Sequence, residues 1–328
     1  MPRGGRMIYI GIDLGGMSAK AGLFKDGELI LKDRIATNPS DGAKGVSDKI
    51  AALARRVIAT SGLSFRDVRA IGIGSPGVVD SATGLIVKWS NYDWKCVPLG
   101  SSVSDLTGKE VYITNDANAA ALGEAKFGAG SNYDDCLLVT LGTGVGGGIV
   151  VGGKLFEGFR GAGAEIGHTV VEMHGRRCGC GRCGCFEQYA SASALIRQTR
   201  SAMAEHPNSL MWETVGGNID KVDGSTAFKT ARLGDELAQI VVNDYIFFLA
   251  EGIANMVNIF RPQAVMIGGG ISNEGEALLK PLRELVNGLI YVSSDYAPLE
   301  IVRAKLGNDA GIYGAYEYAR QHTDDAEN

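Results

Sequence analysis

Twice along this chain, an apolar run ends in a glycine-rich turn and a second apolar run follows at once. The first copy is IGIDLGG at residues 10–16, and the second is VTLGTGVGG at residues 139–147. The chain has 47 glycines in 328 residues, about twice the usual share, and they gather in a few such turns. Glycine in a turn lets the backbone approach a ligand closely. The pattern therefore predicts an internal repeat, with one strand–turn–strand unit in each of two α/β halves.

The segments around these copies indicate the local structure. Three strands joined by tight turns are expected over residues 7–35, with Asp26-Gly27 as the hairpin turn between the second and the third. A helix is expected over 44–60, where apolar residues recur at helical spacing. VYITND at 111–116 predicts a strand that ends in polar residues, and the Ala-rich segment 117–128 predicts the helix after it.

The glycine turns are candidates for binding a nucleotide. LGTGVGG matches the G-x-G-x-x-G pattern of dinucleotide-binding proteins, but another strand follows it where that motif requires a helix. Backbone N–H groups in a tight turn can still form a nest for phosphate oxygens. A single turn of this kind is more often an ordinary hairpin. Because each of the two turns follows a buried strand, we interpret the pair as holding the phosphates of a nucleotide between two domains.

Charge and hydropathy limit the partners. The formal net charge is −5 and the 32 Lys and Arg residues form no basic stripe, so a nucleic-acid partner is not expected. The N-terminal residues lack the apolar stretch of a secretory signal. The most apolar helical segment, 244–260, is too short and too polar to span a bilayer, which predicts a core or subunit-interface helix. We therefore expect a cytoplasmic protein with no membrane partner and with reduced thiols.

The densest chemical feature is CGCGRCGCFE at residues 178–187, which holds four of the six cysteines. These cysteines are too crowded for good disulfides among themselves, and in a reducing compartment their spacing indicates a metal site. With His168, three of the thiolates would make a closed tetrahedral zinc site of the structural kind. By spacing alone, Cys183 is a further candidate ligand, His174 is a rival imidazole, and reactive thiols are the alternative to a metal.

Asn115 and Asp116 stand where a predicted strand stops and a helix begins. Such residues commonly cap a helix by accepting from its unpaired N–H groups. The alternative is that Asp116 is a general base, because phosphoryl transfer to an alcohol needs an acceptor for the hydroxyl proton. Asp13 likewise follows an apolar strand, beside Gly15 and Gly16, where a carboxylate could hold Mg²⁺ through water.

Four segments together resemble one known family: IDLGG, TNDANAAALGE, LVTLGTGVGGGIVVGGKLFEGFRGAGAEIGH and CGCGRCGCFE. By these segments the chain is similar to the ROK family of sugar kinases, from about residue 8 to about residue 320. The resemblance implies an α/β, actin-like or hexokinase-type ATPase fold with two α/β domains around a cleft. We place one domain at 1–114 plus 305–328 and the larger one at 115–304. GSPGVVD and WSNYDWKCVPL are more similar to bacterial glucokinases than to amino-sugar kinases.

The resemblance also implies roles for single residues. It makes Asp116 the catalytic base. The implied zinc ligands, which leave Cys183 out, are His168, Cys178, Cys180 and Cys185. The implied sugar contacts, which the zinc would brace, are Asn91, Asn115, Asp116, Glu165, His168 and Glu187. The implied contacts to ATP and Mg²⁺ are Asp13, Gly15, Gly16, Ser18, Gly142, Thr143, Gly144, Gly268 and Gly269.

One position departs from the family pattern. Many members have a threonine where this chain has Met17, so a hydroxyl that would donate to phosphate is missing unless the neighbouring Ser18 supplies one. This departure bears on the affinity for ATP and on the choice of phosphoryl donor.

These observations predict an ATP-dependent kinase of a hexose 6-hydroxyl, with glucose as the expected substrate. N-acetylmannosamine, N-acetylglucosamine and fructose are the alternative sugars, because their rejection depends on the shape of loops. The alternative of another class is a non-catalytic, sugar-binding ROK regulator, which would need an N-terminal helix-turn-helix where the first strand already begins near Ile8. A homo-oligomer, dimer or tetramer, is expected from the family and from the apolar helix at 244–260.

Overall fold

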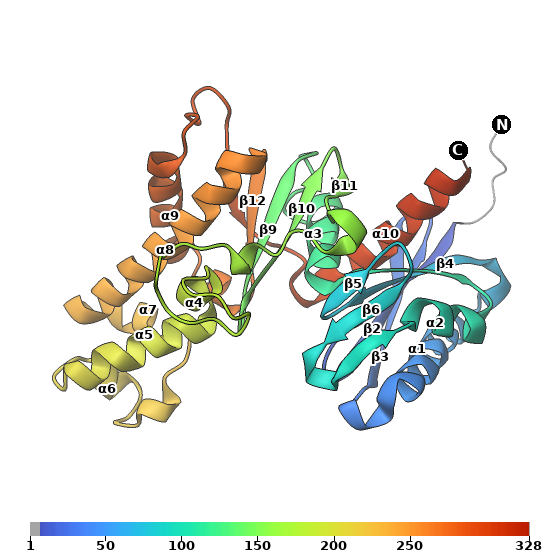
Figure 1. Cartoon of the computed structure of the whole chain (residues 1–328), viewed down its shortest axis with the longest axis horizontal. Helices are drawn as coiled ribbons and strands as arrows, with labels where there is room; N and C mark the ends of the chain where they lie inside the picture. The colour runs from blue at the N-terminus through green and yellow to red at the C-terminus, as the bar shows by residue number, and fades with distance from the viewer. Residues whose placement is uncertain (1–6, 328) are drawn as a thin grey trace. The chain divides into compact units, whose positions relative to one another are not determined.

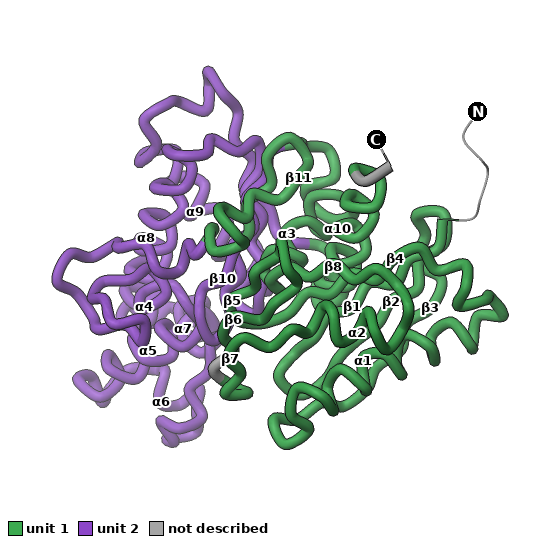
Figure 2. Tube along the Cα trace, turned by 45° about the vertical axis from the view of Figure 1, so that its right-hand side comes forward, with its two compact units in different colours: residues 1–134, 148–164, 305–328 green, residues 135–147, 165–304 purple. Residues whose placement is uncertain are grey.

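The computed structural model describes residues 7–327, except for the side chains of Ser90, Ala326 and Glu327. Residues 1–6, where no secretory signal is expected, lie outside this range. The chain forms two compact units, coloured separately in Figure 2. Unit 1 comprises Met1–Asp134, Gly148–Ala164 and Lys305–Asn328, and unit 2 comprises Asp135–Gly147 and Glu165–Ala304.

Unit 1 is built on a five-stranded sheet with the order β3-β2-β1-β4-β8. The first three strands form an antiparallel meander, and β4 and β8 continue it in parallel. Asp26 and Gly27 join β2 to β3 with φ of 51° and 92°, which confirms the predicted hairpin turn. The strands are β1 (Ile8–Leu14), β2 (Ser18–Lys25), β3 (Glu28–Ala36), β4 (Val68–Ser75) and β8 (Glu110–Asn115).

The two faces of this sheet are covered by different helices (Figure 1). Alternation along β1 places Ile8, Ile10 and Ile12 in one core with apolar residues of the helices α1 and α2. Tyr9, on the opposite face, packs in a second core with residues of α10. The helices are α1 (Gly42–Ala59), α2 (Leu99–Thr107), α3 (Asp116–Phe127) and α10 (Ala310–Glu327).

Glycines let α10 approach the sheet and α3 at backbone distance. A Cβ atom at Gly72 of β4 would lie 1.7 Å from the Ala315 carbonyl oxygen, and one at Gly314 would lie 1.6 Å from that of Ala119. Any side chain at either position would force the backbones apart. This packing fixes α3, and therefore its first residue, against the sheet and the C-terminal helix.

A second sheet repeats the topology of the first, with the order β11-β10-β9-β12-β13. In both sheets, three strands that follow one another in sequence are joined by two parallel strands, β12 pairing with both β9 and β13 in parallel. The internal repeat predicted from the glycine turns is therefore present in the fold. The strands are β9 (Cys136–Leu141), β10 (Val145–Val151), β11 (Lys154–Leu155), β12 (Ala264–Gly268) and β13 (Glu300–Arg303).

A small antiparallel sheet was not predicted. It inserts between β4 and α2, and Trp89, Tyr92 and Trp94 pack there against one another. Its strands are β5 (Val78–Asp80), β6 (Leu85–Trp89) and β7 (Trp94–Val97).

Helices fill most of unit 2, including the predicted helical segment 244–260. The longest, α8, begins at Glu236, earlier than the predicted segment, and by length and composition it is apolar enough to cross a membrane. However, 61% of its most apolar window is buried inside the protein, which is typical of a core helix. The helices are α4 (Glu187–Ala190), α5 (Ala192–Glu205), α6 (Met211–Thr214), α7 (Thr226–Ala231), α8 (Glu236–Phe260) and α9 (Glu276–Leu289).

The compact units do not follow the predicted division near residue 115. They place residues 115–134, 148–164 and 305–328 with the N-terminal part of the chain. The reason lies in packing, since α3 is held between the first sheet and α10. The domain boundaries predicted from the sequence, 1–114 plus 305–328 and 115–304, stay a prediction.

Candidate functional site

The turn between β1 and β2 directs its peptide groups in one sense. The Gly15 carbonyl accepts from the Thr37 hydroxyl at 3.3 Å, the Gly16 carbonyl from the Tyr92 hydroxyl at 3.1 Å, and the Met17 carbonyl from the Thr37 amide at 3.1 Å. In a planar trans peptide the N–H points away from the carbonyl. The N–H groups of Gly16 and Met17 are therefore directed away from Thr37 and Tyr92, as an anion-binding turn requires.

Asp13 precedes this turn and faces the start of α10. Its carboxylate lies 3.5 Å from Lys20 Nζ, and Lys20 also donates to the Asn308 carbonyl at 3.1 Å. Burial raises the pKa of Asp13, the Lys20 charge opposes that shift, and the nearby Asp309 adds to it. A divalent cation would relieve the same electrostatic cost, so the setting of Asp13 is compatible with Mg²⁺ held beside the turn.

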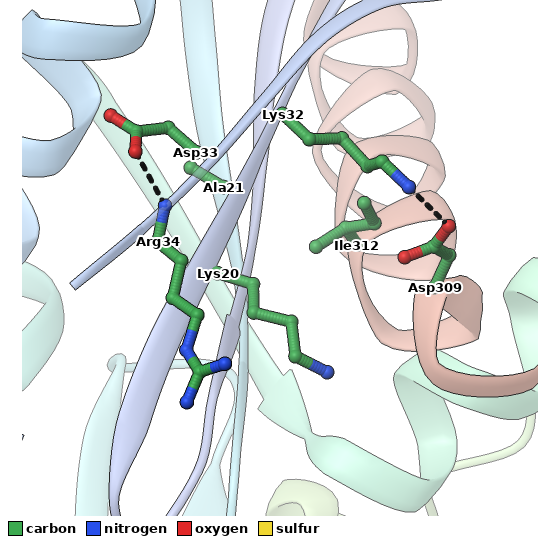
Figure 3. Close-up of a pocket in the computed structure, with 7 residues that line it drawn as sticks. All are labelled: Lys20, Ala21, Lys32, Asp33, Arg34, Asp309 and Ile312. Atoms are coloured by element: carbon green, nitrogen blue, oxygen red, sulfur yellow. Dashed lines mark hydrogen bonds and ion pairs between the residues drawn. The ribbon is translucent and has the colours of Figure 1, made fainter. Parts of the chain in front are cut away.

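Lys20 and Asp309, which interact with Asp13, line a pocket of about 390 Å³ within unit 1 (Figure 3). Lys32 reaches across it to Asp309 at 2.7 Å, so the charges of these two groups offset each other. The pocket is lined by Lys20, Ala21, Lys32, Asp33, Arg34, Asp309 and Ile312.

Asn115 and Asp116 lie at the junction of β8 and α3, as the sequence predicts. Asn115 Oδ1 accepts from the amides of Ala117 and Asn118, so Asn115 is the helix cap, and its Nδ2 donates to the Gly77 carbonyl at 3.0 Å. Asp116 is the first residue of α3 and is half-buried, with its Oδ1 accepting from the Ala117 amide at 2.9 Å. The cap and the acid are therefore two residues, and the helix start holds both side chains in place.

Asn91, the remaining predicted sugar contact of unit 1, lies in a 3-10 turn (Ser90–Tyr92) and is exposed. A Cβ atom at Gly16 would lie 4.0 Å from Asn91 Nδ2. The structure thus brings Asn91 next to the β1–β2 turn.

The turn between β9 and β10 repeats the β1–β2 arrangement in unit 2. Its Gly142 carbonyl accepts from the Ala192 amide at 2.8 Å, at the start of α5, and Thr143 is exposed at the tip. Gly269 lies against the end of β9, because a Cβ atom there would be 2.4 Å from the Leu141 oxygen, and its φ is +81°. The turns at Gly268-Gly269 and at Gly142–Gly144, both predicted to contact ATP, are therefore neighbours.

The cysteine cluster assembles around one point. The ligand atoms of His168, Cys178, Cys180 and Cys185 all lie within 4.8 Å of one another. Cys180 Sγ and Cys185 Sγ are 3.6 Å apart, and Cys178 Sγ is 3.7 Å from His168 Nδ1. Tetrahedral zinc with Zn–S bonds of about 2.3 Å places its ligand atoms about 3.8 Å apart, so the four residues fit that ion.

The protonation chemistry of the cluster agrees with a metal site. Burial, together with the neighbouring thiols, raises the pKa of Cys185 to about 12. Such a thiol is neutral at pH 7 unless a cation stabilises its thiolate, so a divalent ion would release a proton on binding. Cys183 is exposed and lies outside the cluster, as does His174.

Glu187 begins α4 immediately after the cluster and is half-buried. Its Oε1 lies 3.9 Å from Cys178 Sγ, and its Oε2 lies 2.1 Å from the place that a Cβ of residue 144 would take. Gly144 therefore leaves space for the Glu187 carboxylate. Glu165 precedes the 3-10 turn Ile166–His168, is exposed, and contributes its carbonyl to the His168 amide at 3.1 Å.

Several polar contacts at these positions were not foreseen. Lys20 follows from the register of the predicted hairpin, because a four-residue turn pairs Leu14 with Ala19 and Asp13 with Lys20. Thr37 and Tyr92, which orient the first turn, leave no local signal, because each is distant from the turn in sequence.

Comparison with known proteins identifies the family of the chain. The family model described as "ROK family" matches residues 9–322. The glucokinase of Thermotoga maritima is 41% identical over 311 residues, covering 94% of this chain and 96% of that protein. The glucokinase of Halalkalibacterium halodurans is 37% identical, covering 97% of both chains.

A solved structure leads to the same class. The crystal structure of a ROK family glucokinase from Streptomyces griseus, in complex with glucose and AMPPNP, has a TM-score of 0.77 and 36% identity, covering 96% of this chain and 99% of that one. This chain therefore belongs to the ROK family and has the actin-like, hexokinase-type ATPase fold. The family and the fold class predicted from the sequence are confirmed.

Proposed function

We propose that this protein is an ATP-dependent sugar kinase that transfers the γ-phosphoryl group of ATP to the 6-hydroxyl of glucose. The observation that carries the proposal is the position of Asp116, a half-buried carboxylate held at a strand–helix junction in a chain that is 41% identical to a glucokinase. The two glycine turns and the residues around the cysteine cluster supply the other elements of such a site.

In the proposed reaction, Asp116 accepts the proton of the 6-hydroxyl while the O6–phosphorus bond forms and the bond to the β–γ bridging oxygen breaks. ADP leaves with that oxygen. The N–H groups of the turns at Gly15–Met17 and Gly142–Gly144 bind phosphate oxygens, and exclusion of water prevents hydrolysis of ATP. Mg²⁺, held beside Asp13, would neutralise charge on the phosphates when bound.

Sugar recognition is assigned to Asn91, Asn115, Glu165, His168 and Glu187, whose amides, carboxylates and imidazole pair with adjacent hydroxyls. An acceptor that the bound sugar buries and leaves unpaired costs about 1–3 kcal/mol, so a group buried in this way discriminates against a sugar that lacks its partner. His168 Nδ1 faces the thiols, which leaves its Nε2 for a sugar hydroxyl.

Zinc is proposed as a structural brace, bound by His168, Cys178, Cys180 and Cys185. Four protein ligands close the coordination shell, so no position remains for a catalytic water. Its role is to fix the segment that carries Glu165 and Glu187. Adenosine is assigned to the turn at Gly268-Gly269, next to the second phosphate turn.

The test is ADP release with Mg-ATP against glucose, N-acetylglucosamine, N-acetylmannosamine, mannose, fructose and no sugar. Release that requires glucose is the expected result. Preference for an acetamido sugar would overturn the choice of substrate while keeping the reaction. No sugar-dependent release from zinc-replete protein would overturn the kinase assignment itself.

We further propose that the protein acts in the cytoplasm, where its six free cysteines stay reduced, and that it self-associates. Ile240 and Phe247, seven residues apart on α8, are 56% and 44% exposed and offer an apolar stripe for a second copy. Light scattering of the pure protein should give a mass above that of one chain, and Phe247→Glu should return it to a monomer.

A further inference from the structure

Glu157 of unit 1 is an acidic residue with no role in the proposed function so far. Hydrogen bonds link it to β8, the strand that leads into the proposed base, and to α10. Its Oε1 accepts from the Thr114 hydroxyl at 2.6 Å, and its Oε2 accepts from the Tyr318 hydroxyl at 2.9 Å. Glu157 is half-buried, whereas Thr114 is fully buried and Tyr318 is 3% exposed. Burial, and secondarily the Glu157 charge, raises the pKa of Tyr318, so its hydroxyl remains a donor. Both carboxylate oxygens of Glu157 thus accept a hydrogen bond from a hydroxyl group.

The partner Thr114 is the residue directly before Asn115 and Asp116. It lies on the last part of β8, in register with Gly74 of β4, where the parallel pairing ends one residue later. Beyond that point the sheet no longer fixes the chain, and side chains must do so. Asn115 donates to the Gly77 carbonyl and accepts from the first amides of α3. Glu157 adds a hydrogen bond from the Thr114 side chain to the segment after β11.

Glu157 also begins the irregular segment that leads to Glu165. Four residues of that segment, Gly158, Arg160, Gly161 and Ala164, have positive φ, so its path is tightly specified. Arg160 Nε donates to Asp80 Oδ2 at 2.9 Å, which fixes the middle of the segment to β5. Glu157 is the fixed point at its start.

We propose that Glu157 is a positioning residue for phosphoryl transfer, acting through Thr114 to hold the end of β8 so that Asp116 meets the sugar hydroxyl. This inference rests on the proposed role of Asp116 as the base. A misplacement of a catalytic group by about 1 Å costs about a hundredfold in rate, so one hydrogen bond adjacent to the base is sufficient to be seen in kcat.

The test compares two variants that each remove one donor from the same carboxylate. Thr114→Val deletes the hydroxyl next to Asp116, and Tyr318→Phe deletes the one on α10. We expect kcat with glucose to fall about tenfold or more in Thr114→Val, with KM for ATP within about twofold, and to stay near the wild-type value in Tyr318→Phe. Thr114→Ser, which keeps the hydroxyl, should restore kcat.

Glu157→Leu, which removes both carboxylate acceptors, completes a double-mutant cycle with Thr114→Val. It should lower kcat as Thr114→Val does, and the double variant should be no slower than either single one, because both remove the same interaction. Thermal unfolding of every variant separates this effect from a loss of fold. Equal losses of kcat in Thr114→Val and Tyr318→Phe that follow the loss of Tm would overturn the proposal and leave Glu157 a purely structural residue.

The outcome also separates this inference from the proposed function. If the wild-type protein shows sugar-dependent turnover while Thr114→Val and Glu157→Leu match it, only the positioning role fails. If the wild-type protein shows no turnover with any sugar, the positioning role fails together with the kinase assignment.

Discussion

The two groups of proposed sugar-binding residues are held in different ways. In unit 1, Asn115 and Asp116 stand where a sheet strand becomes a helix, and the ladder of β4 and β8, the helix start and the close packing of α10 fix them. In unit 2, His168 and the cysteines lie on an irregular segment that leads to α4 through the 3-10 turn Ile166–His168 and two isolated bridges.

This difference in how the two groups of residues are held indicates the role of the cysteine cluster. Regular secondary structure orients a polar side chain through many backbone hydrogen bonds, whereas an irregular segment has few and needs another constraint. A metal bound to four residues of one short segment supplies that constraint, because its binding free energy is also folding free energy for the segment. We therefore expect unit 1 to hold its catalytic pair without metal and unit 2 to depend on it.

The largest effect is expected from Asp116→Ala. Loss of the proton acceptor should lower kcat by about 10²- to 10⁴-fold, while the free energy of unfolding changes by less than about 1 kcal/mol because Asn115 still caps the helix. Steady-state ADP release and thermal unfolding measure the two quantities. Asp48→Ala, an exposed acid on α1, is the matched control. An Asp116→Ala variant with most of its kcat would show that the base lies elsewhere.

The next largest effect is expected from Cys185→Ser, which removes a buried ligand of the cluster. Zinc content should fall to background and KM for glucose should rise about tenfold or more, with a smaller change in KM for ATP. Cys183→Ser, at an exposed cysteine outside the cluster, should keep zinc and activity. Full glucose affinity in zinc-free Cys185→Ser protein would contradict the bracing role.

A smaller effect is expected from Gly144→Ala. The new Cβ would stand 2.1 Å from Glu187 Oε2, so the carboxylate must move away. Loss of its hydrogen bond to the sugar costs about 1–3 kcal/mol, so glucose affinity should fall about tenfold. Gly142→Ala, whose Cβ would meet no atom closer than 4.0 Å, is the control. Calorimetric titration with glucose distinguishes them, and equal affinities would remove Glu187 from the sugar site.

The smallest effect is expected from Met17→Thr at the first turn. Met17 is 82% exposed, so the replacement disturbs no packing and adds a hydroxyl that can donate to a phosphate oxygen. A net hydrogen bond of about 0.5–1.5 kcal/mol lowers KM for ATP about two- to tenfold. Met17→Val has the shape of threonine without the hydroxyl and should leave KM unchanged. An equal change in both variants would exclude a hydrogen bond as the cause.

Much of the fold and of the candidate site could be predicted from local sequence patterns. The alternation in β1, the Asp26-Gly27 turn and the glycine turns each depend on neighbours in sequence, and so does the clustering of His168 with the cysteines. Contacts between distant segments gave no such signal. The Glu157–Thr114 bond joins residues 43 positions apart, and the small sheet β5-β6-β7 consists of strands too short for a clear period.

The division into units was equally hidden from the sequence. The assignment of α3 to unit 1 is consistent with its packing on α10, and glycines at 123 and 314 permit that packing only once the two helices are side by side. A local pattern shows that a glycine is present but not which backbone will lie against it.

Hydrogen exchange, followed peptide by peptide before and after zinc removal from the wild-type protein, tests the contrast between the two units most directly. The amides of Val171, Cys178 and Gly184, which bond to carbonyls within the cysteine segment, report on unit 2, and residues 110–127 report on unit 1. We predict that chelation removes protection over 165–186 and leaves 110–127 unchanged. Equal protection of both segments with and without zinc, or a uniform loss in both, would contradict the account.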